Sequence, residues 1–165
     1  MLTRDNVKKL VAVSAVAVAA ICGFEGYREY AYKDVAGVPT IGYGTTKNVK
    51  MGDKTTRQEA KTFLVRDASG MAKQMQSLIK VPLFQHEWDA YLSFTYNVGV
   101  GNFRSSTLLK KLNAGDYAGA CAQLKRWVYA GYRTVCTNGK CIKVRNKPKG
   151  LVNRREAEYK MCMGK

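Results

Sequence analysis

The sequence is poor in histidine, proline and acidic side chains. It holds one His, three Pro and 12 Asp and Glu among 165 residues, against 28 Lys and Arg. The lone His86 and the lack of a Cys-x-x-Cys pair argue against zinc, because structural zinc takes four closely spaced Cys or His ligands. We therefore expect no metal and no cofactor. With 46% hydrophobic residues, the chain suits a single globular domain.

The shortage of acids leaves a net charge of +16. A field of this sign favours a polyanionic partner, such as nucleic acid, an acidic membrane or an anionic cell envelope. The sequence has no Cys/His finger, no basic region followed by heptads and no aromatic ribonucleoprotein motif. These absences argue against nucleic acid as the partner.

Also missing is an uncharged apolar run of the roughly 20 residues that span a bilayer. Residues 10–24 (LVAVSAVAVAAICGF) are uncharged but form a shorter run, and they follow a basic start that includes Arg4, Lys8 and Lys9. Because alanine and valine dominate, such a segment would enter a membrane at marginal free energy and could leave it again.

Three interpretations of residues 10–24 are open. A secretory signal could be cleaved after the small residues 17–19 (Ala-Val-Ala). A lipoprotein signal could end at Cys22, although Ile21 is unfavourable before that cysteine. The segment could also stay uncleaved as a reversible anchor.

Downstream, the pattern predicts a small sheet region followed by helices. Residues 27–43 are rich in aromatic and β-branched side chains and are interrupted by glycines and Pro39, which predicts two or three short strands. A capping box at residues 56–59 (TRQE) opens a helix that should end by residue 81, before Pro82.

Helical spacing of apolar residues continues through the second half of the chain. Further helices are predicted at residues 85–97, 105–112 and 115–127, and from Asn153 onward. The break after the first of these is expected at Gly99, Gly101 and Asn102. Together the elements predict an α+β fold, with a small β-sheet lobe packed against a larger helical lobe.

Five cysteines is an odd number, so one thiol stays free in a fully paired monomer. Cys136 and Cys141 flank Thr-Asn-Gly-Lys, whose Asn-Gly predicts a tight hairpin turn. They suit a small disulfide-closed loop in an oxidising compartment, or else two free thiols on a loop. Cys121 and Cys162 fall on two predicted late helices and could pair. Cys22 would then be free, either as a packed bystander or as a regulatory redox element.

Two of the scarce carboxylates, Glu25 and Asp34, lie where the apolar segment meets the β-rich region. Glu25 follows Ile-Cys-Gly-Phe, and apolar surroundings favour the protonated form of a carboxyl group. Asp34 lies among polar and glycine residues and should stay ionised. Glycosidic bonds are cleaved by such a pair, in which one group protonates the leaving oxygen and the other directs the attack.

The pattern Glu25-x8-Asp34-x5-Thr40, within FEGYREYAYKDVAGVPTIGYG, resembles the catalytic signature of the phage lysozyme (endolysin) family, glycoside hydrolase family 24. Later blocks resemble the family's cleft-lining helix and its carboxy-terminal helices: residues 94–103 (FTYNVGVGNF) and 150–156 (GLVNRRE). The resemblance covers nearly all of the chain after the apolar segment. One departure is Thr45, at a position where many relatives carry histidine.

The resemblance implies a lysozyme-like fold and a muramidase, which hydrolyses the β-1,4 bond between N-acetylmuramic acid and N-acetylglucosamine in peptidoglycan. It implies that Glu25 is the general acid. Asp34 would orient an attacking water or stabilise the transition state, and Thr40 would help to hold that water. Arg154 resembles the arginine that pairs with the catalytic glutamate, and Asn97 a residue that contacts the glycan.

The position of Glu25 also resembles the signal-anchor-release class of endolysins. In that class the chain divides into an anchor, residues 1–24, and a lysozyme-like domain, residues 25–165. Glu25 directly follows the apolar segment. If that segment lay in the bilayer, Glu25 would be held at the membrane, away from Asp34 and Thr40. We therefore expect an uncleaved, inactive form tethered to the inner membrane through residues 10–24. After release it would act as a monomer on peptidoglycan in the host periplasm.

Two other functions remain open from the sequence. A lytic transglycosylase also uses one glutamate, but it forms an anhydro sugar without the water that Asp34 and Thr40 would hold. A non-catalytic basic protein that binds the cell envelope would explain the charge and the apolar segment.

Overall fold

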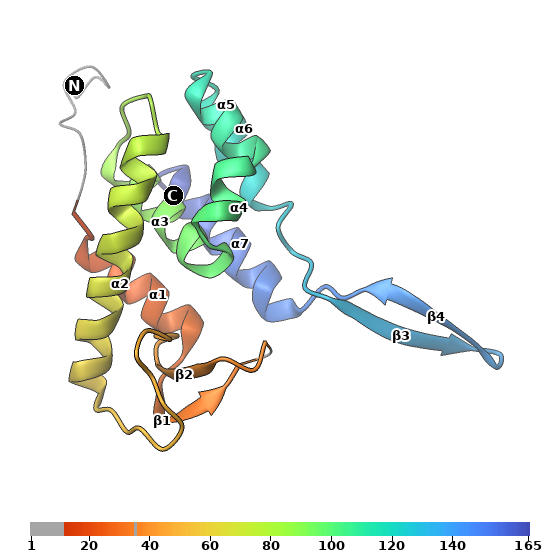
Figure 1. Cartoon of the computed structure of the whole chain (residues 1–165). Helices are drawn as coiled ribbons and strands as arrows, with labels where there is room; N and C mark the ends of the chain where they lie inside the picture. Colours follow the sequence, from red (N-terminus) through yellow and green to blue (C-terminus); the bar gives the residue numbers. More distant parts are fainter. Residues whose placement is uncertain (1–11, 35) are drawn as a thin grey trace.

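The structure, a computed structural model of the chain, describes residues 12–34 and 36–165. Its elements in chain order are α1 (Ala15–Glu25), β1 (Arg28–Lys33), β2 (Pro39–Gly42), α2 (Arg57–Leu78), α3 (Gln85–Val98), α4 (Val100–Ser105), α5 (Thr107–Asn113), α6 (Tyr117–Leu124), β3 (Tyr132–Thr137), β4 (Lys140–Arg145) and α7 (Lys149–Cys162). Figure 1 shows β1 and β2 at one end of a helical body, and β3 and β4 projecting away from that body. The predicted α+β arrangement is confirmed.

The β lobe contains the short strands that the aromatic and glycine pattern predicts. β1 and β2 pair antiparallel, with Tyr32 opposite Thr40. Gly42 ends β2 at a φ of 65°, and a Cβ at this position would lie 2.8 Å from the Cβ of Ala60 in α2. Glycine is therefore required here for two reasons, the left-handed backbone and the close approach of β2 to α2.

Two helices begin where strong local sequence signals predict them. At α2 the Thr56 hydroxyl accepts the N–H of Glu59, while the Glu59 carboxylate accepts the N–H of Thr56. This reciprocal pairing satisfies two backbone donors that have no partner inside the helix. At α5 the cap is a single hydrogen bond, in which the Ser106 hydroxyl accepts the N–H of Leu109.

Three helix boundaries differ from the predictions. Gly101 and Asn102 lie inside α4, so Gly99 alone separates α3 from α4, with a φ of 84°. α6 ends three residues before Trp127, at Leu124. α7 begins at Lys149 rather than at Asn153.

α1 is packed into the folded body. The Ser14 hydroxyl accepts the N–H of Ala17 and donates to the Asp89 carboxylate of α3 at 2.8 Å. Ala17 is fully buried in the main core, which lies around α3, and Ile21 is fully buried in a second cluster with Leu64 of α2. The described part of the apolar segment thus joins two hydrophobic clusters.

The predicted basic start (Arg4, Lys8 and Lys9) and the beginning of the apolar segment at Leu10 lie outside the described residues. Within residues 12–34 and 36–165, no helix is both long enough and apolar enough to cross a bilayer.

Two disulfides fasten the later part of the chain. Cys121 of α6 joins Cys162 of α7, and Cys136 joins Cys141 across the β3–β4 hairpin. The hairpin turn at residues 138–139 (Asn-Gly) has φ values of 51° and 74°, as a tight two-residue turn requires. The sequence suggested the Cys136–Cys141 loop, with free thiols as the alternative, and left Cys121–Cys162 as a possible pair; the structure has both disulfides. Cys22 is free and lies half-buried against the second hydrophobic cluster.

Candidate active site

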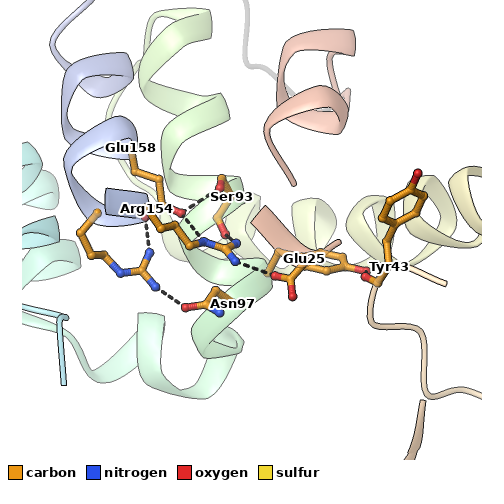
Figure 2. A network of polar contacts seen from close by, with 8 residues as sticks. Glu25, Tyr43, Ser93, Asn97, Arg154 and Glu158 are labelled. Atoms are coloured by element: carbon orange, nitrogen blue, oxygen red, sulfur yellow. Dashed lines mark hydrogen bonds and ion pairs between the residues drawn. The ribbon is translucent and has the colours of Figure 1, made fainter. Parts of the chain in front are cut away.

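Glu25 is the last residue of α1, and its carboxylate points at Arg154 of α7 (Figure 2). Arg154 Nη1 lies 2.7 Å from Glu25 Oε1. The arginine side chain is 5% exposed and the glutamate side chain 23% exposed, so the pair lies at the edge of the protein interior. The aromatic ring of Phe24 stacks on the guanidinium, whose carbon lies 4.9 Å from the ring centroid. One oxygen of Glu25 is therefore held by a charge-assisted hydrogen bond.

The other oxygen of Glu25, Oε2, lies beside Gly44. A Cβ at Gly44 would lie 3.9 Å from Oε2 and 3.8 Å from the ring of Tyr96. The φ of Gly44 is 92°, a backbone conformation that other residues rarely adopt. No hydrogen bond from the described part of the chain reaches Oε2, so this oxygen is left for an external group.

A buried ionic network holds Arg154 in place. Arg154 Nε donates to Glu158 Oε1 at 3.0 Å, Nη2 donates to the carbonyl of Ser93 at 2.9 Å, and the Ser93 hydroxyl donates to Glu158 at 2.8 Å. The neighbouring Arg155 donates to the second oxygen of Glu158. Glu158 is fully buried, and a buried charge that loses its partner is strongly destabilising. Glu158 therefore orients both guanidinium groups.

Arg155 carries the network on to Asn97, at the exposed end of α3 (Figure 2). Burial lowers the pKa of Arg155, although the charge of Glu158 opposes this shift. The side-chain oxygen of Asn97 accepts from the guanidinium. Its amide hydrogens have no partner among the described residues, so they remain available to a ligand.

Asp34 and Thr40 belong to the β1–β2 hairpin rather than to the helical body. Asp34 Oδ1 accepts the N–H groups of Ala36 and Val38, at 2.9 and 2.8 Å, and so fixes the turn. The Thr40 hydroxyl is nearly buried and donates to the carbonyl of Val38 at 2.9 Å. No hydrogen bond or ion pair between described residues joins Glu25 to Asp34 or Thr40. The structure thus gives Asp34 a local structural role, while its Oδ2 stays unbonded to the described part of the chain.

Thr45, the position at which a departure from the family pattern is expected, is almost fully buried. Its hydroxyl donates to the Asp67 carboxylate of α2 at 2.8 Å, and its N–H and carbonyl bond to Ile41. Thr45 therefore makes a polar link between the β lobe and α2.

Tyr96 supports the same region from α3. Its hydroxyl donates to the carbonyl of Tyr43 at 3.0 Å. Burial raises the pKa of Tyr96, and the negative charges of Asp67 and Glu25 raise it further. Tyr96 is therefore a neutral hydrogen-bond donor that ties the strand end beside Gly44 to α3.

Ser93, Arg155 and Glu158 belong to this network but were not predicted from the sequence. Glu158 follows the two arginines at the i+3 and i+4 spacing of helical ion pairs, which was an available signal. That spacing is more often found on exposed helix faces, so it does not by itself indicate a buried network. No cluster of three or more His, Cys, Asp or Glu side chains suited to a metal occurs in residues 12–34 and 36–165.

Known proteins resemble this chain over most of its length. The family model described as Phage lysozyme matches residues 22–158. The SAR-endolysin of Bacteriophage PS119 is 41% identical, over 97% of this chain and 93% of that protein. Among solved structures, the endolysin from Escherichia coli O157:H7 phage FAHEc1 has a TM-score of 0.75 at 37% identity, with 92% of both chains covered. A mutant of P22 lysozyme has a TM-score of 0.77 at 29% identity, with 93% and 99% covered.

Proposed function

From the premise that the chain belongs to the phage lysozyme family, we propose that Glu25 is the acid of its glycosidic cleavage. The chain is a phage endolysin of the muramidase type, a glycoside hydrolase that acts on peptidoglycan. The observation that supports the role of Glu25 is the asymmetry of its carboxylate. Oε1 is bound by Arg154, while Oε2 is unbonded beside Gly44.

In the proposed reaction, Oε2 of Glu25 gives its proton to the glycosidic oxygen as the bond breaks. Positive charge then develops on the sugar ring, and Asp34 stabilises it or orients the water that attacks the anomeric carbon. Thr40 helps to hold this water. Arg154 binds the carboxylate that Glu25 becomes after proton transfer, and the buried Glu158 keeps Arg154 in the required orientation.

The matched variants Glu25→Gln and Glu29→Gln test the acid. Both remove one carboxylate, but Glu29 is an exposed β1 residue paired with Lys54 at 3.1 Å. We expect Glu25→Gln to lower turnover of purified murein by at least about a hundredfold, within the range of general acid catalysis. Glu29→Gln should keep its turnover and the wild-type unfolding temperature, and Glu25→Gln should remain folded at the assay temperature although it loses the ion pair with Arg154. Full turnover by Glu25→Gln would refute the assignment.

The chemistry of the product separates hydrolysis from transglycosylation. Mass spectrometry of the released muropeptides should find reducing ends, because water attacks the anomeric carbon. Anhydro ends would instead mean that a sugar hydroxyl attacks, and Asp34 and Thr40 would then have no water to hold. If binding without cleavage caused lysis, Glu25→Gln would still lyse cells.

For residues 1–24 we propose a membrane tether that is released uncleaved, so that the enzyme acts in the host periplasm. The relatives named SAR-endolysins support this, as does the place of Glu25 at the end of α1. Ala17 and Ile21 are buried in the folded body, and they cannot be in a bilayer at the same time. Residues 25–165 would form the body that α1 joins after release. A collapsed membrane potential would favour release, since the potential helps to hold an oriented charged terminus.

Exposed alanines of the segment allow a sharp test. Ala12, Ala15 and Ala19 are exposed, so changing them alters membrane affinity more than internal packing. Leucine at the three positions should retain the protein in the membrane fraction and delay lysis. Glutamine at the same positions is the matched control and should favour the soluble fraction. Lysis by the leucine variant at the wild-type time would contradict tethering.

A further inference from the structure

The β3–β4 hairpin extends from the body between α6 and α7, and its strands pack on each other (Figure 1). Isolated two-stranded hairpins are at best marginally stable in water. This one is closed near its tip by the Cys136–Cys141 disulfide. At its base, the N–H of Ala130 donates to the carbonyl of Asn146, and the N–H of Asn146 donates to the carbonyl of Gly131. The hairpin is thus held in shape at both ends while its faces stay open.

The charge of this hairpin has one sign. Residues 130–149 carry six basic and no acidic residues: Arg133, Lys140, Lys143, Arg145, Lys147 and Lys149. All six are exposed. None forms an ion pair with a residue that the structure describes. The guanidinium of Arg145 lies 4.1 Å from the ring centroid of Tyr129, outside the hairpin. The hairpin is therefore a concentrated cationic arm.

One face of the arm is aliphatic. Opposed residues of an antiparallel pair share a face, and successive pairs alternate between faces. The observed register pairs Arg133 with Val144, Val135 with Ile142, and Thr137 with Lys140. These three cross-strand pairs lie on the same face of the hairpin, with the Val135 and Ile142 pair in the middle. Ile142 is 62% exposed, and the two valines are half-buried. An apolar stripe thus runs between two basic residues. We name this surface, formed by Arg133, Val135, Lys140, Ile142 and Val144, the hairpin face.

The composition of the hairpin face distinguishes between anionic partners. Phosphates of a nucleic acid or carboxylates of peptidoglycan would bind the cations but leave Ile142 in water. An anionic phospholipid surface binds both the basic and the aliphatic side chains of the hairpin face. Its headgroup phosphates attract Lys and Arg, and the aliphatic side chains enter the boundary of the acyl region. Tyr132, 71% exposed on the opposite face, is of a type enriched at membrane interfaces.

We propose that the β3–β4 hairpin is a membrane-docking arm that lays the hairpin face on an anionic phospholipid bilayer. This contact is separate from residues 1–24, and it leaves the Glu25–Arg154 pair intact. It would hold the folded enzyme at an anionic membrane surface by weak, reversible binding. It depends on neither the hydrolytic mechanism nor the tether.

Co-sedimentation of the full chain with vesicles tests the arm. Vesicles of phosphatidylethanolamine and phosphatidylglycerol (3:1) provide the anionic surface, and phosphatidylcholine vesicles provide the neutral one. The variants are Arg133→Gln/Lys140→Gln and Ile142→Ser. The control Lys61→Gln/Lys73→Gln removes the same charge from exposed positions of α2. All variants keep residues 1–24, so any binding through that segment is common to them.

We expect the arginine–lysine variant to bind anionic vesicles about 25-fold more weakly, since each basic residue near such a surface contributes about fivefold. Ile142→Ser should weaken binding roughly tenfold through lost apolar burial. The α2 control should stay within about twofold of wild type. At 0.5 M salt the effect of Arg133→Gln/Lys140→Gln on vesicle binding should vanish, while the effect of Ile142→Ser should persist. Unchanged unfolding temperatures and murein turnover would establish that the variants are folded.

Two results would overturn the proposal. Hairpin variants that bind anionic vesicles as well as the α2 control would exclude a lipid contact at this face. Variants that keep vesicle binding but lose binding to purified murein sacculi would assign the arm to peptidoglycan instead. Loss of turnover by Glu25→Gln alone would leave the vesicle result unaffected, so the two proposals fail separately.

Discussion

Replacing Glu158 by glutamine would remove the single carboxylate that holds both buried guanidinium groups behind the site. Glutamine keeps the size of the side chain and one acceptor oxygen, so the change is mainly one of charge. Arg154 is 5% exposed and Arg155 1% exposed, and neither can turn to water without unpacking α7. Breaking a buried ion pair by removing one partner costs about 3–5 kcal/mol.

For a chain of this length, each 1 kcal/mol lowers the unfolding temperature by about 2–4 °C. We therefore expect Glu158→Gln to unfold about 6–20 °C below wild type in calorimetry or thermal circular dichroism. Murein turnover measured well below that temperature should also fall, because Arg154 would no longer be held toward Glu25. The substrate KM should change less than kcat, since the change is to orientation rather than to a binding surface.

The matched control is Glu156→Gln on the same helix. Its carboxylate pairs with Lys125 at 3.2 Å, and both side chains are more than 40% exposed. Exposed pairs of this kind contribute at most about 1 kcal/mol. If Glu158→Gln lowered the unfolding temperature no more than Glu156→Gln does, the buried network would not stabilise the fold by the amount that its burial predicts.

Three further predictions concern the scaffold. Gly42→Ala should lower the free energy of unfolding by about 1–3 kcal/mol in urea titration, because the new methyl group would meet Ala60 and the φ of 65° would be strained; a neutral change would mean that β2 shifts freely. Changing both cysteines of the α6–α7 disulfide to serine should cost about 4 kcal/mol for a sequence separation of 41, whereas removing the hairpin disulfide, with a separation of 5, should cost about 2 kcal/mol. Hydrogen bonds from Thr56 lower the pKa of Glu59 below 4.5, so its stabilising contribution is present above pH 4.5 and is lost as the pH falls through the lowered value. In a plot of unfolding free energy against pH, Glu59→Gln should therefore lose less stability on the acid side than the wild type does. An unchanged loss of stability at low pH would exclude the Glu59 carboxylate as one of its causes.

Elements set by local chemistry were predictable from the sequence. The capping box at residues 56–59, the Asn-Gly turn and the glycine-rich β1–β2 region depend on neighbours within a few positions, and each is found in the structure. Boundaries without such a signal were less accurate. α7, which begins at Lys149, packs against α3 and α6, and its N-cap residue Pro148 makes no side-chain cap hydrogen bond.

The site was predictable only in part, for a similar reason. Glu25 and Arg154 were identified from a family pattern, but no role was predicted for Glu158 and Ser93, the residues that hold Arg154. The spacing of Arg155 and Glu158 indicates an ion pair, yet it does not report burial. Burial arises because α3 and α7 pack together, and the carbonyl and hydroxyl of Ser93 then complete the network.

The pairing of Glu25 with Arg154 also has a consequence for the timing of synthesis. The two residues are 129 positions apart, one near each end of the chain. At about 5–20 residues per second, a ribosome adds the arginine about 6–26 seconds after the glutamate. During that interval the nascent chain holds the acid without its partner. A chain that stops before α7 lacks Arg154, so the Glu25–Arg154 pair does not form in it.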